Sequence, residues 1–120
     1  MSSYVGSTYA SFAAFLGKKD SRTIQGKRAT RVERRSDGIV VTYHGTVMVG
    51  AYPDGTFRIF GGIGSATDNV RINTYSPARV SQRDYRRYIA TGERDERGRA
   101  VTIPFRSGMT IAADGTPVLA

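Results

Sequence analysis

Recognition of phosphate is the chemistry that the side chains of this chain suit best. The 120 residues include 18 Lys and Arg against 10 Asp and Glu, which gives a net charge of +8. Fifteen of these cations are Arg and three are Lys. Arg binds phosphate through two parallel hydrogen bonds and stacks on bases, so this bias favours a phosphate-bearing partner. A GC-rich genome also raises Arg over Lys whatever the function. The net charge is therefore the stronger argument, because it must create a positive surface potential.

The first basic group lies at residues 18–22, K-K-D-S-R. Lys18, Lys19 and Arg22 could neutralise phosphates, and Ser21 could add a hydroxyl contact. The carboxylate among them could orient the arginine. The alternative is a solvated turn between a helix and a strand, in which the Asp and Ser side chains cap the backbone. Four further cations in the following residues are candidate phosphate ligands: Lys27, Arg28, Arg31 and Arg34.

A second basic group, at residues 83–88, interleaves Arg with Tyr. In proteins that bind single strands, aromatic rings stack on bases while Arg holds the backbone. Residues 78–90 could form an amphipathic helix with both tyrosines in the core, or two short strands that turn at Arg83-Asp84. Strands are slightly favoured, and no RNP-like or helix-turn-helix signature accompanies the group. The group predicts phosphate contacts through its arginines and stacking through its tyrosines: Arg83, Arg86, Arg87, Tyr85 and Tyr88.

A glycine loop at residues 61–65 leads to the start of a predicted helix at Thr67. Backbone N–H groups at a helix N-terminus form a natural anion site, and Arg71 would lie on that helix. No Gly-Lys-Ser/Thr follows the loop, and the dinucleotide fingerprint is missing too. A plain glycine connection is therefore the favoured interpretation, with Arg71 kept as a candidate phosphate ligand.

Catalytic and metal chemistry has few candidate residues. The chain has no Cys, which excludes disulfides, thiolate metal sites and Cys nucleophiles. His44 is the single histidine and cannot form a His-based zinc site. No nucleophile elbow stands out, and no pair of carboxylates suits acid–base work. We expect a protein that is not an enzyme and that holds neither a metal nor a cofactor.

The sequence predicts no membrane span. No apolar run approaches the ~18–20 residues that a spanning helix requires. Residues 1–16 have no basic start and no long apolar centre, so they do not predict a secretory signal. We expect a cytoplasmic protein, or one packaged in a particle assembled there, with no membrane partner.

The elements that would position these groups predict one mainly β domain of the α+β class. Residues 1–16 are uncharged and form either a short helix or a flexible arm. In the helix, Ser or Thr at 7–8 would cap the start and apolar side chains at 12, 15 and 16 would share one face. Gly17 would end it.

Residues 29–60 predict an antiparallel meander of about four strands that forms a small barrel-like sheet. Apolar and polar residues alternate there in the strand period, and turn-forming Gly, Pro and Asp residues separate the strands. Residues 67–74 predict a short helix, which Pro77 stops. Residues 17–77 would then form the core of the single domain.

The C-terminal part, residues 78–120, predicts hairpins. Residues 91–99 alternate acids with arginines and predict a charged loop. Two apolar stretches, 100–105 and 109–114, flank a short turn and predict a hairpin with each other.

Residues 16–77, about half of the chain, carry a resemblance to a known family. Six short motifs occur in order: L-G-K-K-D-S-R at 16–22, E-R-R-S-D-G-I at 33–39, H-G-T at 44–46, P-D-G-T at 53–56, G-G at 61–62 and R-I-N at 71–73. With this combination the chain resembles small proteins encoded by tailed bacteriophages, especially those of actinobacteria. The resemblance implies a phage origin, and a place in the host cytoplasm during infection or on the virion. It implies no mechanism. Ile63 departs from the family's frequent aromatic after the glycine pair, and the chain from Ser81 has no support from the resemblance.

Three functions remain open from the sequence. The favoured one is a basic phage accessory protein that binds nucleic acid with weak sequence preference, because backbone contacts carry no base information. A second is an anti-defence protein that sequesters a nucleotide signal of the host, as a symmetric β homo-oligomer with Arg-lined pockets. A third is a virion protein or a binder of a host protein, which would use exposed strand edges for β-augmentation.

Overall fold

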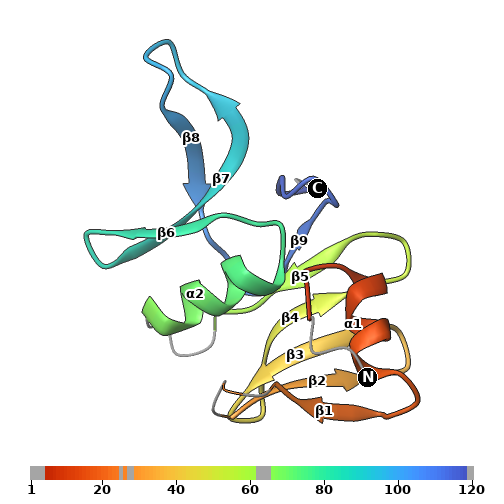
Figure 1. Cartoon of the computed structure of the whole chain (residues 1–120). Helices are drawn as coiled ribbons and strands as arrows, with labels where there is room; N and C mark the ends of the chain where they lie inside the picture. Colours follow the sequence, from red (N-terminus) through yellow and green to blue (C-terminus); the bar gives the residue numbers. More distant parts are fainter. Residues whose placement is uncertain (1–4, 25, 27–28, 62–65, 119–120) are drawn as a thin grey trace.

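The structure is a computed structural model that describes residues 5–24, 26, 29–61 and 66–118. In these ranges the chain forms nine strands and two short helices (Figure 1). The strands make two antiparallel sheets, one of six strands and one of three. The prediction of a mainly β fold of the α+β class is confirmed.

The first helix, α1 (Tyr9–Leu16), begins where the sequence predicted a cap. The Thr8 hydroxyl accepts a hydrogen bond from the Ser11 backbone N–H at 3.0 Å, and the Ser11 hydroxyl accepts one from the Thr8 backbone N–H at 3.0 Å. This reciprocal capping box satisfies donors that the start of a helix leaves unpaired. The predicted apolar face is buried, and Gly17 follows the last turn at a φ of 58°. The helix, rather than a flexible arm, is therefore the correct option for this segment.

The predicted meander of four strands is confirmed. Its strands, each antiparallel to the next, are β2 (Thr30–Arg34), β3 (Ile39–Tyr43), β4 (Thr46–Ala51) and β5 (Phe57–Ile59). In β2 the side chains alternate, with Val32 buried in the core and Arg31 exposed. A further strand, β1 (Ser21–Thr23), pairs with β2 at the edge of the sheet. Its three residues are too few to show the alternation on which strand prediction depends.

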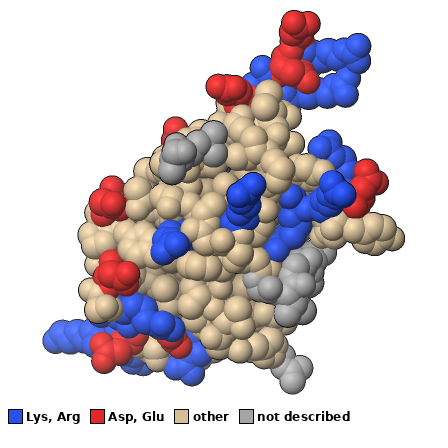
Figure 2. Space-filling model, turned by 180° about the vertical axis from the view of Figure 1, so that it is seen from behind, with Lys and Arg blue, Asp and Glu red and all other residues tan. Residues whose placement is uncertain are grey.

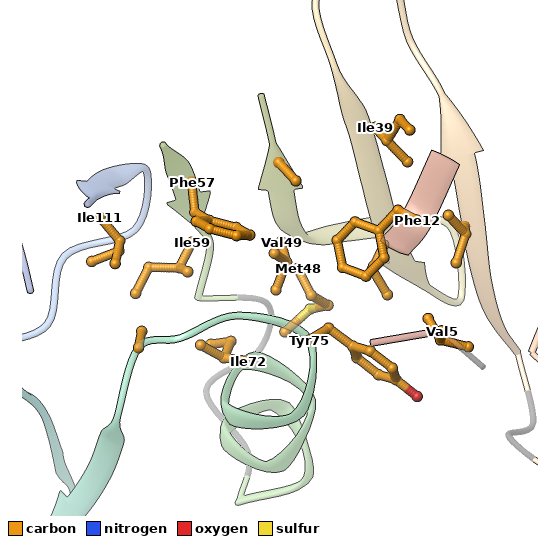
Figure 3. Packing of buried hydrophobic residues seen from close by; sticks show 14 of the residues in the cluster. Val5, Phe12, Ile39, Met48, Val49, Phe57, Ile59, Ile72, Tyr75 and Ile111 are labelled. Carbon is orange, nitrogen blue, oxygen red and sulfur yellow. The ribbon is translucent and has the colours of Figure 1, made fainter. Parts of the chain in front are cut away.

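The second helix, α2 (Ala66–Tyr75), confirms the helix predicted at 67–74 and extends it by one residue at each end. It packs on β4, whereas α1 packs on β2 and β3. Figure 3 shows the resulting core, in which Ile72 and Tyr75 of α2 lie close to Met48 and Val49 of β4. No helix in the described ranges is long and apolar enough to cross a membrane.

The six-stranded sheet is open, so the predicted barrel-like closure is wrong. Its order is β1-β2-β3-β4-β5-β9, where β9 is Met109–Ile111, and β1 and β9 form opposite edges. Because the two helices cover one face of the sheet, its apolar side chains are buried without closure. Burial against helices is an alternative to closing a sheet on itself.

The second sheet consists of β6 (Val80–Arg83), β7 (Arg86–Arg94) and β8 (Ala100–Pro104). The favoured strand interpretation of residues 78–90 is thus confirmed, with the turn at Asp84-Tyr85, one residue later than predicted. Only part of the predicted charged loop is a loop, because β7 continues to Arg94. The β7–β8 hairpin projects from the body of the molecule (Figure 1).

The predicted hairpin between 100–105 and 109–114 is wrong. β8 pairs with β7, and β9 pairs instead with β5, where Ile111 lies opposite Phe57. Both of these side chains are buried in the main core. The apolar surface buried at the edge of the six-stranded sheet therefore decides the partner of β9. The short distance along the chain between β8 and β9 does not decide it.

Burial of Tyr75 predicts a loss of stability at alkaline pH. Its side chain is buried, which raises its pKa, while the nearby Arg71 cation opposes the shift. The folded state therefore holds the phenol proton more tightly than the unfolded chain, whose tyrosines titrate near pH ~10. Stability is full below that pH and declines as pH rises through the higher pKa of the folded state. Thermal melts above pH ~10 should show a smaller decline for Tyr75→Phe than for the wild type. An equal decline in both proteins would contradict the prediction.

Candidate functional site

Arg22 and Arg34 hold the C-terminal end of α1. Arg22 Nη1 donates to the Phe15 carbonyl at 2.8 Å, and its guanidinium carbon lies 4.1 Å from the centre of the Phe15 ring. Arg34 Nη2 donates to the Gly17 carbonyl at 3.0 Å. The last carbonyls of a helix lack partners within it and carry partial negative charge, so cations there stabilise the helix. These two predicted phosphate ligands thus make contacts inside the protein.

The other described members of the first basic group are more accessible. Lys18 and Lys19 are exposed after the end of α1. Arg31 Nη2 donates to Ser21 Oγ at 2.7 Å across the β1–β2 pair, which fixes both side chains on the sheet face opposite the helices. Two members lie outside the described residues: Lys27 and Arg28.

Arg71 packs on the six-stranded sheet. Its guanidinium carbon lies 3.5 Å from the centre of the Tyr43 ring, and its Nε donates to Thr30 Oγ1 at 3.3 Å. These contacts tie α2 to β2 and β3. The glycine loop that would complete the predicted anion site is outside the described residues over 62–65.

Arg87 points into the space between the two sheets and α2. Its Nε donates to Asn69 Oδ1 at 2.7 Å and its Nη1 donates to the Gly61 carbonyl at 2.8 Å. The guanidinium carbon lies 4.4 Å from the centre of the Phe105 ring. Its Nη2 is buried and has no hydrogen-bond partner among the described residues. Burial lowers the pKa of Arg87, and the nearby Asp68 carboxylate opposes that shift. This predicted phosphate ligand therefore links α2, β7 and the segment after β5.

Three side chains of the second basic group, Arg83, Arg86 and Tyr88, share the opposite face of β6 and β7. In the antiparallel pairing Arg83 lies directly opposite Arg86, and Ser81 lies opposite Tyr88. Strand alternation puts these side chains on the face away from Arg87. The Arg83 guanidinium carbon lies 4.7 Å from the centre of the Tyr88 ring. Tyr85 stands at the turn between them. We call these four residues the β6–β7 platform: Arg83, Tyr85, Arg86 and Tyr88.

The two arginines of the platform are exposed, and within the described residues neither forms an ion pair. Like charges directly opposite each other on a strand pair repel. Residues 80–90 contain three Arg and a single acid, Asp84. This part of the surface therefore keeps an unneutralised positive charge.

Tyr85 is both strained and exposed. It follows Asp84 in a two-residue turn in which both residues have positive φ, 54° and 65°. Such a type I′ turn favours Asn-Gly or Asp-Gly, because a side chain at the second position meets steric strain. The Tyr85 side chain is 98% exposed, so no packing within the described protein offsets that cost.

Several of the remaining basic residues lie beside acids. Figure 2 shows Lys and Arg in separate groups on this face of the molecule, several of them beside Asp or Glu. At the end of β2, Arg35 pairs with Glu33 at 2.9 Å. Over residues 93–99, in the projecting hairpin, three Arg accompany three acids. The net positive charge is thus spread over the molecule, and the described basic residues do not gather on a single face.

The comparisons with known proteins leave the chain without an assigned family. No family model, no curated protein and no solved structure matches it significantly. The resemblance to tailed-phage proteins stays a prediction.

The sequence did not indicate one residue that lies on the same face of β6 and β7 as the platform. Ser81 lies opposite Tyr88 and is exposed on the same face. A lone serine in a polar segment gives no signal by composition. Once the two strands and the two-residue turn are fixed, the strand period puts Arg86 and Arg87 on opposite faces, and the contacts of Arg87 show which face is inward.

Replacement of Arg87 by Lys tests its structural role. Arg87→Lys keeps the positive charge but loses the planar fork that reaches both Asn69 and Gly61. The free energy of unfolding should fall by about 2 kcal/mol, because a charged hydrogen bond is lost and its acceptor stays buried. Urea denaturation measures this change. The control is Arg86→Lys on the exposed face, which should change stability by no more than ~0.5 kcal/mol. A similar loss in both variants would refute the structural role of Arg87.

The strain at Tyr85 predicts a gain in stability when it is removed. Tyr85→Gly creates an Asp-Gly pair, which suits a type I′ turn. The free energy of unfolding should rise by about 1 kcal/mol, since the strain of a left-handed tyrosine exceeds the entropy cost of the glycine. Urea denaturation of the wild type and the variant tests this. A lower stability of the glycine variant would show that Tyr85 contributes to folding.

Proposed function

We propose that this chain binds nucleic acid through the β6–β7 platform, with weak sequence preference. The observation that carries the proposal is the exposed, unneutralised pair Arg83 and Arg86, directly opposite each other beside two aromatic rings. Two adjacent guanidinium groups can hold neighbouring phosphate oxygens through paired hydrogen bonds.

The repulsion between Arg83 and Arg86 makes an anion a favourable partner. In the free protein the two like charges destabilise the strand pair slightly. A phosphate group between them would replace that repulsion with two attractions and would release counterions from the nucleic acid. Contacts of this kind fix the position of the backbone and read no base, so the expected sequence preference is weak.

The form of the surface favours a polymer over a free nucleotide. Small-molecule sites usually bury about 70–90% of the surface of their ligand in a concave pocket. The platform is instead an exposed strand face with a turn at its end. A shallow cleft of about 260 Å³ elsewhere, between the start of α1 and Ala113, is lined by uncharged residues and does not suit phosphate.

The distribution of charge supports a modest, salt-sensitive affinity. The net charge of +8 attracts a polyanion over a distance set by ionic strength. Arg22, Arg34 and Arg87 add to that field although their nitrogens donate to groups of the protein itself. The platform would supply the direct contacts to phosphate.

The test is the salt dependence of binding to a short labelled DNA oligonucleotide, followed by fluorescence anisotropy. Each of Arg83→Gln and Arg86→Gln should weaken binding several-fold at low salt, because one phosphate contact is lost. Each should also lower the slope of log affinity against log salt by about 0.7–0.9. Arg97→Gln is the matched control, since it removes the same charge from the projecting hairpin. Binding that is insensitive to salt, or equal effects of all three variants, would exclude the platform as the binding surface.

A further inference from the structure

Resting on this proposed function, we infer that the Tyr85 ring stacks on one unpaired base. The site would therefore bind single-stranded nucleic acid in preference to a regular duplex. The arginines supply affinity for the backbone, and Tyr85 supplies the discrimination between strands and duplexes.

The Asp84-Tyr85 turn holds its tyrosine in an unusual backbone conformation. A tyrosine at a φ of 65° is a rare conformation for a bulky residue, and the residue before it has a φ of 54°. Such outliers persist where the surroundings impose them, and they cluster at sites that bind. Here the β6–β7 pairing on both sides, Arg83 opposite Arg86, imposes the two-residue turn.

The Tyr85 ring is open to solvent. Tyr85 is 98% exposed, against 63% for Val70 and 49% for Val118, the other large exposed apolar residues among those the structure describes. Its turn lies at an end of the molecule away from the six-stranded sheet (Figure 1). Nothing in the described protein covers the ring, so both of its faces are open to a flat ligand. A tyrosine also loses little rotamer freedom on binding, since it has only two side-chain torsions.

Tyr88 does not offer the same surface. The Arg83 guanidinium already lies 4.7 Å from the centre of its ring, and the side chain is half-buried. This cation–π contact holds Arg83 in place for a phosphate. The two tyrosines that the sequence predicts as equivalent stackers thus divide into one that orients an arginine and one that is open to a base.

Charge and geometry together select the ligand. An apolar protein partner would meet Arg83 and Arg86 within two residues of the ring and would have to remove their water. A nucleic acid presents phosphates to the arginines and a base to the ring. In a regular duplex the faces of the bases are stacked on each other, so a ring on an exposed turn reaches them only where a base is unpaired. Base–aromatic stacking contributes about 1–3 kcal/mol per base, whichever base is present.

The experiment compares three ligands of equal length and charge per strand. The first is an oligothymidylate of about 12 nucleotides, the second is the same backbone with abasic sites, and the third is the corresponding duplex. The wild type should bind the oligothymidylate about tenfold more tightly than the abasic strand. Tyr85→Ala should bind these two ligands equally, and Tyr85→Phe should restore the difference because it keeps an aromatic face. Val70→Ala is the control for removal of an exposed apolar side chain.

The arginine variants separate the two proposals. Arg83→Gln should weaken binding to the oligothymidylate and to the abasic strand by the same factor, because both ligands keep their phosphates. If the wild type binds both strands equally, or if Tyr85→Ala retains the base-dependent difference, the stacking role is overturned while nucleic-acid binding stands. If the wild type binds none of the three ligands at low salt, the proposed function fails and the inference fails with it. Capture of a protein through Tyr85 with unchanged oligonucleotide affinity would also overturn it.

Discussion

One half-buried guanidinium joins β7 of the smaller sheet to α2 and to the segment after β5. Arg87 donates from β7 to Asn69 on α2 and to the Gly61 carbonyl after β5, while its face lies on Phe105. These contacts come from four parts of the chain that are distant in sequence. They also fix which side of β7 faces inward. Since neighbouring residues of a strand point to opposite faces, anchoring Arg87 inside directs Arg86 and Tyr88 to the outside. A contact that serves packing thus decides what the surface presents.

Arginine serves two different purposes in this protein. Some guanidinium groups donate to backbone carbonyls of the protein itself, as Arg22 and Arg34 do at the end of α1, or lie on aromatic rings, as Arg71 does on Tyr43. Such groups stay charged and contribute to the overall field, but some of their donors are used within the protein. A count of basic residues therefore overstates the number that can contact a ligand. The charge that is both exposed and unpaired is concentrated in fewer positions, of which Arg83 and Arg86 are the best placed.

The turns of the molecule differ in how well their residues suit the backbone conformation. In the turns at 53–56 and 113–116, an Asp carboxylate accepts hydrogen bonds from the backbone N–H and the hydroxyl of a Thr two residues later. Those bonds lower the pKa of Asp54 and Asp114, as expected for hydrogen bonds to the charged form. Each of these turns contains a Gly at positive φ. The Asp84-Tyr85 turn has no such glycine and places an exposed aromatic ring where glycine is preferred.

Local signals in the sequence were enough to predict α1, the four strands of the meander and α2, because capping, alternation and turn residues act over a few neighbours. The platform is predicted in part. The sequence indicates the group at 83–88, but it does not distinguish Arg86 from Arg87 as phosphate ligands, or Tyr85 from Tyr88 as stacking residues. Their separation needed the inner contacts of Arg87 and the cation–π contact of Arg83, which join residues far apart in the chain or across two strands. The partner of β9 was likewise decided by burial of Ile111 against the main core. The sequence determined which segments become helices and most of those that become strands. Only tertiary packing decided which faces are buried, because the free energy of burial depends on residues that are distant in the chain.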